Sequence, residues 1–519
     1  MFRSRNQYRI PNIISIFILG MFLLSSGIWQ PAQAAPAATF NITVDTGTDD
    51  PLKSACTEAA NDCSLRGAIS YANATDYGSE IHITIPALTF YSTHYVPNEN
   101  DNQTGDWDIK GHTVYLEGAG RNLTIIDGQT MDRVIDNIGS TLTLEHLKLT
   151  QGKAPTGDSG GGGILNRGGS TLNLIDVLIE NNVVEGTSQY VDIGGGVGNY
   201  GTLNIQSSVI NDNHACNGGG VGSNAAWMTI DGTTISNNEA RTGTTSCGDG
   251  GGIATLNGQW TFELSGLILE YNTADRGGGI FYNGSTEGNV TDSNIWFNTT
   301  SSSGAGIYNY GHITLNRVTL SGNNATSTGG GITNAHELKL YNVTLSDNSA
   351  NNGGGIYNNG GTTVSLDHCS LANNSTIQLG SAYYGEIVSQ AYTHNTIFAS
   401  ASSGNTCYLS EPDVITDLGN NLSSDHSCSF TTGANDLIDT DPMVIDLSWN
   451  GGVTQTMALQ YGSPAIDTAD PANTLSKDQR GYFRPVDGDS NGTSIADIGA
   501  FEYASFLLDI FSWLPLIMK

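Results

Sequence analysis

The sequence predicts an all-β protein built as a parallel β-helix, in which short strands wind into coils that stack on one another. Two repeated signatures and a pattern of alternating residues lead to this prediction. The first signature is a run of glycines that ends at Gly163, Gly196, Gly220, Gly252, Gly279, Gly306, Gly331 and Gly355. The steps between these positions are 33, 24, 32, 27, 27, 25 and 24 residues.

The second signature is an aliphatic residue followed by two others and then Asn. It ends at Asn182, Asn213, Asn238, Asn272, Asn298, Asn323, Asn348 and Asn374, and its last five steps are 34, 26, 25, 25 and 26 residues. Between the signatures lie alternating runs such as "ITLNRVTL" (313–320), which are typical of half-buried strands. A unit of this size cannot bury its apolar side alone, so we expect units to stack at the ~4.8 Å spacing of neighbouring strands.

This arrangement assigns a structural role to each signature. The aliphatic residues point inward and stack into a core. Each asparagine tolerates a left-handed backbone and can bond to turn backbone or to the asparagine of the next coil. The glycine run, for example Gly353, Gly354 and Gly355 in "NNGGGIYNNG", lies at a bend where backbone approaches backbone.

Insertions into the repeat predict where a ligand binds. Of the stretches between a ladder asparagine and the next glycine run, 183–193 and 239–249 hold 11 residues each, and the other five hold four or five. The variation therefore projects from one corner, which in solenoids commonly forms the binding edge. Within these two loops we expect the ligand-binding residues to be Tyr190, Asp192, Arg241 and Asp249.

The N-terminus resembles an export signal. Arg3, Arg5 and Arg9 precede an apolar stretch at 13–28, and small residues at 32–34 suit a signal peptidase. We expect residues 1–34 to be a signal peptide, with a retained membrane anchor as the alternative. No other segment reaches the ~20 apolar residues of a spanning helix.

Export permits disulfides, and the chain has seven cysteines. The spacing suggests two local bonds, Cys56–Cys63 and Cys407–Cys428. Cys216 and Cys247 fall at the same corner of adjacent coils, which predicts a third bond. Cys369 is left over, and we expect it to be a small buried residue.

The two ends of the chain resemble known modules. "CSLRGAISYAN" (63–73), which reads as a short helix, resembles a CSLREA-type N-terminal module, with Gly67 where that family usually has Glu. The repeats resemble those of the polymorphic outer membrane protein family, which implies a right-handed parallel β-helix. The motifs "GSPAIDTAD" (462–470), "DQRGYFRP" (478–485) and "DIGAFEY" (497–503) resemble the choice-of-anchor Q domain.

These resemblances imply a division of the chain into segments. An N-terminal cap spans 35–110, a right-handed parallel β-helix spans 111–400 and a C-terminal cap spans 401–503. The apolar tail 504–519 is either an anchoring signal or an element that packs on the cap.

One loop of the C-terminal cap resembles a calcium-binding loop. "DGDSNGTSIADI" (487–498) begins like an EF-hand, with Asp487, Asp489 and Asn491 at ligand positions. The twelfth position is Ile498, so we expect Asp497 to close any calcium site. An Asp/Gly turn without a cation is the alternative, and we expect no other cofactor.

Charge and motifs limit the functions that remain. Nineteen Lys and Arg against 50 Asp and Glu give a net charge of −31, which disfavours nucleic acid and anionic membranes as partners. We find no paired carboxylates of a glycosidase, zinc motif or phosphate loop. We therefore expect a secreted or cell-surface protein that binds a glycan, the matrix or an envelope component. The alternatives are a polysaccharide lyase or glycoside hydrolase acting in a groove along the helix, and a structural spacer.

Overall fold

The computed structural model describes residues 39–75, 79–93, 99–155, 159–224, 227–240, 247–258, 261–400, 405–410, 415–430 and 435–504. Contacts divide the chain into residues 1–37 and 38–519, and the described residues all belong to the second unit. The predicted signal peptide, Arg241 and residues 505–519 of the tail lie outside the described residues.

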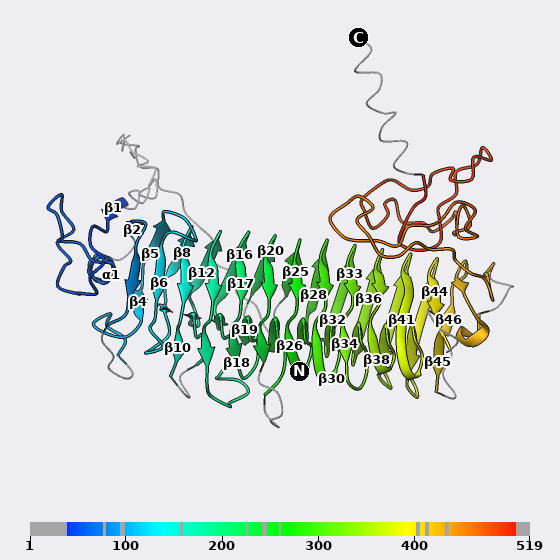
Figure 1. Ribbon diagram of the computed structural model, residues 1–519, viewed down its shortest axis with the longest axis horizontal. Coiled ribbons are helices and arrows are strands. Elements are labelled where there is room, and N and C mark those ends of the chain that lie inside the picture. Colours follow the sequence, from blue (N-terminus) through cyan, green and yellow to red (C-terminus); the bar gives the residue numbers. More distant parts are fainter. Residues whose placement is uncertain are drawn as a thin grey trace, which may run out of the picture. The chain divides into compact units, whose positions relative to one another are not determined.

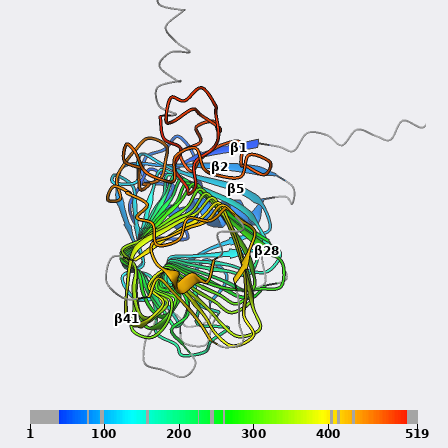
Figure 2. The ribbon, with the colours of Figure 1, turned by 90° about the vertical axis from the view of Figure 1, so that its right-hand side faces the viewer.

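Within the described residues, 47 strands form three sheets whose neighbouring strands are all parallel, and successive coils stack along one axis (Figures 1 and 2). The predicted class, an all-β parallel β-helix, is therefore confirmed. Parallel pairing continues into both segments that were expected to be caps, since β2 pairs with β5 and β43 pairs with β46.

The strands are grouped by sheet. The 14-stranded sheet contains β1 (Thr39–Thr43), β2 (Glu80–Ile85), β5 (Thr113–Gly118), β8 (Thr141–Glu145), β12 (Thr171–Ile175), β16 (Thr202–Gln206), β20 (Met228–Asp231), β24 (Phe262–Ser265), β28 (Glu287–Thr291), β32 (His312–Asn316), β36 (Glu337–Tyr341), β40 (Thr363–Asp367), β43 (Gln390–His394) and β46 (Ile415–Asp417). The 12-stranded sheet contains β4 (Trp107–Lys110), β7 (Ile135–Ile138), β11 (Ile164–Asn166), β15 (Val197–Asn199), β19 (Val221–Asn224), β23 (Ile253–Gly258), β27 (Ile280–Gly284), β31 (Ile307–Asn309), β35 (Ile332–Asn334), β39 (Ile356–Asn358), β42 (Tyr383–Gly385) and β45 (Cys407–Leu409).

The 21-stranded sheet consists of two ladders that join at β41, which pairs with both β37 and β38. One ladder contains β3 (Thr89–Tyr91), β6 (Ile125–Asp127), β9 (Lys148–Thr150), β13 (Leu178–Glu180), β17 (Val209–Asn211), β21 (Thr234–Ser236), β25 (Ile268–Glu270), β29 (Asn294–Trp296), β33 (Thr319–Ser321), β37 (Thr344–Ser346), β41 (Ser370–Leu379), β44 (Ile397–Ser400) and β47 (Leu422–Ser423). The other contains β10 (Lys153–Ala154), β14 (Val183–Val184), β18 (His214–Ala215), β22 (Glu239–Ala240), β26 (Thr273–Arg276), β30 (Thr299–Ser303), β34 (Asn324–Ala325) and β38 (Ser349–Asn352).

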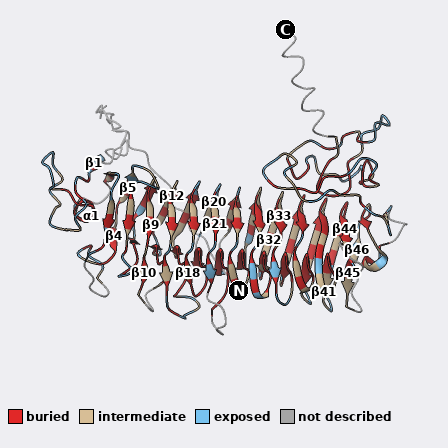
Figure 3. Cartoon of the chain, in the orientation of Figure 1, coloured by how far each residue is buried: buried red, intermediate tan, exposed pale blue. Residues whose placement is uncertain are grey.

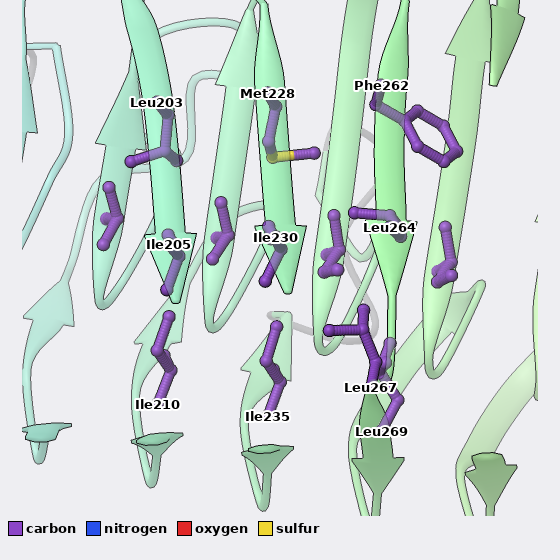
Figure 4. Packing of buried hydrophobic residues seen from close by; sticks show 14 of the residues in the cluster. Leu203, Ile205, Ile210, Met228, Ile230, Ile235, Phe262, Leu264, Leu267 and Leu269 are labelled. Carbon is purple, nitrogen blue, oxygen red and sulfur yellow. The ribbon is translucent and has the colours of Figure 1, made fainter. Parts of the chain in front are cut away.

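The core consists of columns of apolar side chains that stack from coil to coil. Strand register places Leu203, Met228 and Phe262 in one column, and Figure 4 shows these side chains pointing into the same interior. A second column holds Ile210 and Ile235, each fully buried. Buried residues accordingly run along the strands of coil after coil in Figure 3. The alternation seen in the sequence is this inward and outward pattern.

The asparagines of the second signature form a buried ladder through eight coils. Asn298 Nδ2 donates to Asn323 Oδ1 at 3.0 Å, and Asn323 Nδ2 donates to Asn348 Oδ1 at 2.9 Å. The same Asn323 Nδ2 donates to the carbonyl of Ile295 in the preceding coil at 2.9 Å. Each of the eight asparagines is at most 1% exposed. The ladder expected from the sequence is therefore present, and it satisfies backbone groups that the corner would otherwise leave unpaired.

A second buried asparagine ladder follows the 12-stranded sheet. Asn309 Nδ2 donates to Asn334 Oδ1 at 2.7 Å, and Asn334 Nδ2 donates to Asn358 Oδ1 at 2.8 Å. Asn358 in turn donates to the hydroxyl of Tyr383 at 3.0 Å. Each of these asparagines follows the last glycine of a run by three positions and is a buried ladder residue.

The glycine run is required at its three positions for two reasons. Gly353 has φ +63°, a left-handed conformation that side chains disfavour. At Gly354 an added Cβ would lie 2.3 Å from the carbonyl oxygen of Ser375, and at Gly355 it would lie 2.5 Å from that of Ala382. The first glycine therefore makes the bend, and the other two allow the next coil to approach.

The structure contains three disulfides, Cys56–Cys63, Cys216–Cys247 and Cys407–Cys428, which are the pairs that the sequence predicts. Cys369 is a free, buried cysteine, as expected. The Cys216–Cys247 bond joins corners of adjacent coils, with a Cα–Cα distance of 4.8 Å. This pairing supports the register that was derived from the period of the repeat.

The motif "CSLR" forms the start of the helix α1 (Leu65–Ala74) and anchors the N-terminal coils. Ser64 caps the helix by accepting a hydrogen bond from Gly67 N at 2.9 Å. Arg66 is 1% exposed, pairs with Asp49 at 2.5 Å and donates to the carbonyls of Gly105 and Asp106, each at 2.8 Å. The buried guanidinium therefore holds the segment before β4 in place.

Gly67 contacts the preceding loop so closely that a side chain does not fit. A Cβ at this position would lie 1.9 Å from the carbonyl oxygen of Lys53. We expect Gly67→Ala to destabilise the N-terminal coils by about 1–3 kcal/mol, the usual cost of overpacking. Limited proteolysis checks this: cleavage within 44–75 should accelerate, whereas Tyr71→Ala, an exposed change on the same helix, should leave it unchanged. Equal protection of Gly67→Ala and the unaltered chain would contradict the expectation.

Residues 435–504 pack against the final coils of the β-helix. Gln479 is fully buried and donates to Thr319 Oγ1 at 2.8 Å, while its Oε1 accepts from Thr344 Oγ1 at 2.6 Å. Asn294 Nδ2 donates to the carbonyl of Val453 at 3.1 Å. In Figure 1 this orange and red segment lies over the strands near β33. Among the described residues, no helix has the length and apolar character needed to cross a membrane.

Candidate functional site

The first long insertion turns its acidic side chain toward its own backbone. Asp192 is 1% exposed, and its Oδ2 accepts a hydrogen bond from Ser188 N at 2.7 Å. A Cβ added at Gly186 would lie 2.0 Å from the Asp192 carboxyl carbon, so the loop closes tightly around this group. Tyr190 in the same loop is 43% exposed. The loop therefore presents the tyrosine, and the carboxylate stabilises the loop.

The carboxylate of the second long insertion is also used within the protein. Asp249 is 2% exposed, and Arg276 binds it with Nε at 2.8 Å and Nη2 at 2.9 Å. Burial raises the pKa of Asp249, although Arg276 opposes the shift. The guanidinium of Arg276 lies over the rings of Phe281 and Tyr308, at 5.1 and 5.4 Å from their centroids. Asp249 thus fastens its insertion to Arg276 at the end of β26. Arg241 lies outside the described residues.

The predicted calcium loop brings Asp487 and Asp489 together with a carboxylate that the motif did not include. Asp467 accepts hydrogen bonds from Asp489 N at 2.7 Å and Gly488 N at 3.2 Å. One oxygen each from Asp467, Asp487 and Asp489 lies within 4.8 Å of the other two, a group that could hold a metal ion. Asn491 bonds to Asp489 through Nδ2 at 2.9 Å.

Asp497 lies elsewhere, in the interior of the same segment. It is fully buried and accepts hydrogen bonds from Asp467 N at 2.8 Å and Tyr503 N at 2.5 Å. Burial, and then the charge of nearby Glu502, raise the pKa of Asp497 well above its usual range. Its carboxyl group therefore organises the backbone around the acidic loop and is not placed as the closing ligand.

The residue before each ladder asparagine has a left-handed backbone in eight successive coils. Six coils fill this position with residue types that tolerate positive φ, namely Asn181, Asp212, Asn237, Gly322, Asp347 and Asn373. The other two coils place Tyr271 and Phe297 there, each with φ +55°. A left-handed L-residue costs about 1–2 kcal/mol, and bulky residues rarely occupy this region. Strain of this kind tends to persist where it serves a function.

These two rings lie side by side on the surface. Tyr271 is 52% exposed and Phe297 is 47% exposed, and their rings stack with centroids 5.4 Å apart and an interplanar angle of 10°. A Cβ at Gly322 of the next coil would lie 2.7 Å from the Phe297 ring, so this glycine leaves room for it. The two stacked rings thus form a flat apolar patch at a corner where other coils carry Asn, Asp or Gly.

Two tryptophans lie next to this apolar patch. Trp296 lies 6.4 Å from Phe297 and 6.2 Å from Trp449, measured between ring centroids, and its Nε1 donates to Glu270 Oε2 at 2.8 Å. Trp449 is 57% exposed. We call Tyr271, Trp296, Phe297 and Trp449 the aromatic surface. Exposed apolar patches on a soluble domain commonly mark binding sites, and Tyr and Trp are frequent energetic anchors of interfaces.

The aromatic surface was missed by reasoning from the sequence, although half of it leaves a signal there. Tyr271 and Phe297 stand one residue before a ladder asparagine, where most coils have Asn, Asp or Gly. Comparing that column across coils identifies both. The pairing of Trp296 with Trp449 leaves no such signal, because it depends on how residues 449–455 dock on β29.

Comparisons with known proteins add little to this geometry. No protein-family model matches the chain, and no curated protein matches it. The structure is similar to that reported as the crystal structure of pectate lyase Pel9A, with a TM-score of 0.37 and 12% identity over 90% of this chain and 97% of that chain. A likeness of this extent carries no argument about function.

Proposed function

We propose that the chain is an exported, cell-surface β-helix protein that binds a neutral polysaccharide on the aromatic surface. The observation that carries the proposal is the pair Tyr271 and Phe297, exposed aromatic residues held in left-handed backbone on adjacent coils. Asn, Asp or Gly at both positions would relieve the strain at no cost to the ladder. Contact of the two rings with a partner would account for aromatic residues at these positions.

The chemistry of the aromatic surface suits a carbohydrate. Sugar rings have apolar faces bordered by hydroxyl groups, and aromatic side chains bind such amphipathic rings well. Glu270 beside Trp296 supplies a carboxylate that can accept hydrogen bonds from hydroxyls. Tyr271 and Phe297 follow one another along the stacking axis, so a chain of sugar rings can contact both.

The charge of the protein favours a neutral glycan. A net charge of −31 repels polyanions such as acidic polysaccharides, and the repulsion weakens as salt is added. An uncharged chain meets no such barrier. A cell-surface, matrix or envelope polysaccharide of this kind is therefore the proposed partner.

Export and display rest on the ends of the chain. The signal-like start at 1–34 and three disulfides favour an oxidising compartment. The resemblances to a CSLREA-type module and to a choice-of-anchor Q domain support a cell-surface location, with 504–519 as the proposed anchoring signal. We also propose that Asp467, Asp487 and Asp489 bind calcium.

A binding screen tests the proposal. The exported chain is run in affinity electrophoresis against neutral and acidic polysaccharides, and tryptophan fluorescence is followed because Trp296 and Trp449 lie at the surface. We expect retardation and a spectral change with at least one neutral polysaccharide. Binding to none of the panel would contradict the proposal. Release of products would instead favour the alternative function as a polysaccharide lyase or glycoside hydrolase.

A further inference from the structure

Three aspartates lie together at the N-terminal end of the β-helix, far along the chain from the aromatic surface. Asp108 in β4 and Asp136 in β7 stand directly opposite each other on neighbouring parallel strands. Asp106 precedes β4 by one residue. The three residues are 3%, 0% and 0% exposed for Asp106, Asp108 and Asp136. Like charges directly opposite on adjacent strands are destabilising, so the arrangement requires compensation.

The three carboxylates differ in how far hydrogen bonds and arginine side chains compensate their negative charge. Asp136 accepts from Arg133 Nη1 at 2.9 Å and from Arg167 Nε at 2.8 Å. Asp108 accepts a single hydrogen bond in the described residues, from Asn102 N at 2.8 Å to Oδ2, and its Oδ1 has no partner.

The carboxylate of Asp106 is the least compensated of the three. Among the described residues its Oδ1 has no hydrogen-bond partner, and its Oδ2 forms an ion pair with Arg133 Nε at 3.8 Å, beyond hydrogen-bonding distance. Among the described residues, the buried carboxylates of Asp106 and Asp108 together accept only one hydrogen bond, the one from Asn102 N. Arg133 compensates the charge of Asp106 only partly, and a buried charge with incomplete compensation costs several kcal/mol. We therefore expect a proton or a cation to neutralise this group.

We propose that Asp106, Asp108 and Asp136 bind a divalent cation, with calcium as the expected ion. One carboxylate oxygen from each residue lies within 4.8 Å of the other two. Two oxygens that each lie about 2.4 Å from a shared calcium ion are at most about 4.8 Å apart, so the spacing suits this ion. All the donors are hard oxygens, which calcium prefers.

The site would fasten the segment before β4 to the first coils. Arg66 already holds this segment through the carbonyls of Gly105 and Asp106. A cation bound to Asp106 and Asp108 links the same segment to Asp136 in the next coil. The guanidinium of Arg66 and the bound cation would then together stabilise the N-terminal end of the β-helix.

Burial is the main reason that the pKa values of Asp106 and Asp108 are raised, that of Asp108 to about 7. A proton is therefore the competing occupant of this group. The two accounts differ in their dependence on calcium, because calcium stabilises a cation site but not a protonated carboxyl group.

Terbium luminescence tests the proposal in the full exported chain. Trp107 lies between Asp106 and Asp108 in the sequence and can sensitise a bound Tb³⁺ ion. The measurements are made in the variant Asp487→Asn, because this change removes one carboxylate of the acidic group Asp467, Asp487 and Asp489. At pH 8 we expect sensitised emission that calcium displaces, and an affinity at least tenfold lower in Asp106→Asn made on the same background.

Thermal unfolding provides the second readout. In the Asp487→Asn background, calcium should raise the melting temperature relative to chelator, and Asp106→Asn should abolish this increment. If Asp106→Asn fails to fold, Asp108→Asn is measured in its place. Absence of both terbium emission and a calcium increment would overturn the proposal. A stability that falls with rising pH regardless of calcium would assign the group to a proton instead.

Discussion

Asn323→Ala is expected to lower the free energy of unfolding by about 3–5 kcal/mol. Asn323 Oδ1 accepts from both the backbone N and Nδ2 of Asn298, and all three groups are buried. Alanine leaves the backbone N–H of Asn298 and one of its two Nδ2 hydrogens without an acceptor, while the other hydrogen keeps its bond to the carbonyl of Leu269. Each buried unsatisfied hydrogen-bonding group costs about 1–3 kcal/mol. Loss of the bonds from Nδ2 to Ile295 O and Asn348 Oδ1 adds to the effect.

The neighbouring residue supplies a matched control. Asn324 is exposed, and its replacement by alanine should change stability by less than about 0.5 kcal/mol. Urea unfolding followed by circular dichroism compares the two variants with the unaltered chain. A loss of under 1 kcal/mol for Asn323→Ala would show that the ladder is not a main source of stability.

The double variant Tyr271→Asn with Phe297→Asn is expected to lose polysaccharide binding and keep its fold. Asparagine occupies the position before the ladder asparagine in other coils, at Asn181, Asn237 and Asn373, and it tolerates left-handed backbone. Relief of strain offsets the lost packing of the two rings, so we expect stability within about 1 kcal/mol of the unaltered chain or above it. Urea unfolding of the double variant measures this.

The binding loss should be large. Loss of two anchoring aromatic residues commonly weakens binding by about 1–2 kcal/mol each, which corresponds to roughly a hundredfold lower affinity for the double variant. Asn237→Asp, at the same position one coil earlier, should affect neither property. A double variant that is much less stable would contradict the strain argument.

Repetition explains why so much of the fold is predictable from the sequence. Each coil imposes the same demands for glycine at the bend, an aliphatic residue in the core and asparagine in the ladder. Counting along one period therefore aligns eight ladder asparagines and places Cys216 beside Cys247. These are nearest-neighbour relations, and a repeat encodes its own neighbours.

Contacts between distant segments could not be derived in this way. Trp449 meets Trp296 because Val453 and Gln455 dock on Asn294, about 160 residues earlier in the chain. Asp467 joins the acidic loop, while Asp497 turns inward, and neither choice follows from a twelve-residue motif. Asp192 and Asp249 were expected to bind a ligand, but both are buried, Asp192 within its own loop and Asp249 against Arg276.

The burial of charged residues also cannot be predicted from the local sequence. Two strands, β5 and β6, separate Asp106 and Asp108 from Asp136 in the sequence, and Asp residues at such spacing are ordinary on a solvated surface. Arg66 holds the segment just before β4 through the carbonyls of Thr104, Gly105 and Asp106. The sequence shows the arginine in its motif but not the loop that it holds.

The central claim is that the aromatic surface binds a neutral polysaccharide. Isothermal titration of the polysaccharide selected in the screen, into the unaltered chain and into the Tyr271→Asn, Phe297→Asn double variant, tests it most directly. We predict saturable heat for the unaltered chain and an affinity roughly a hundredfold lower for the folded double variant. Equal affinity of the two proteins would contradict the claim.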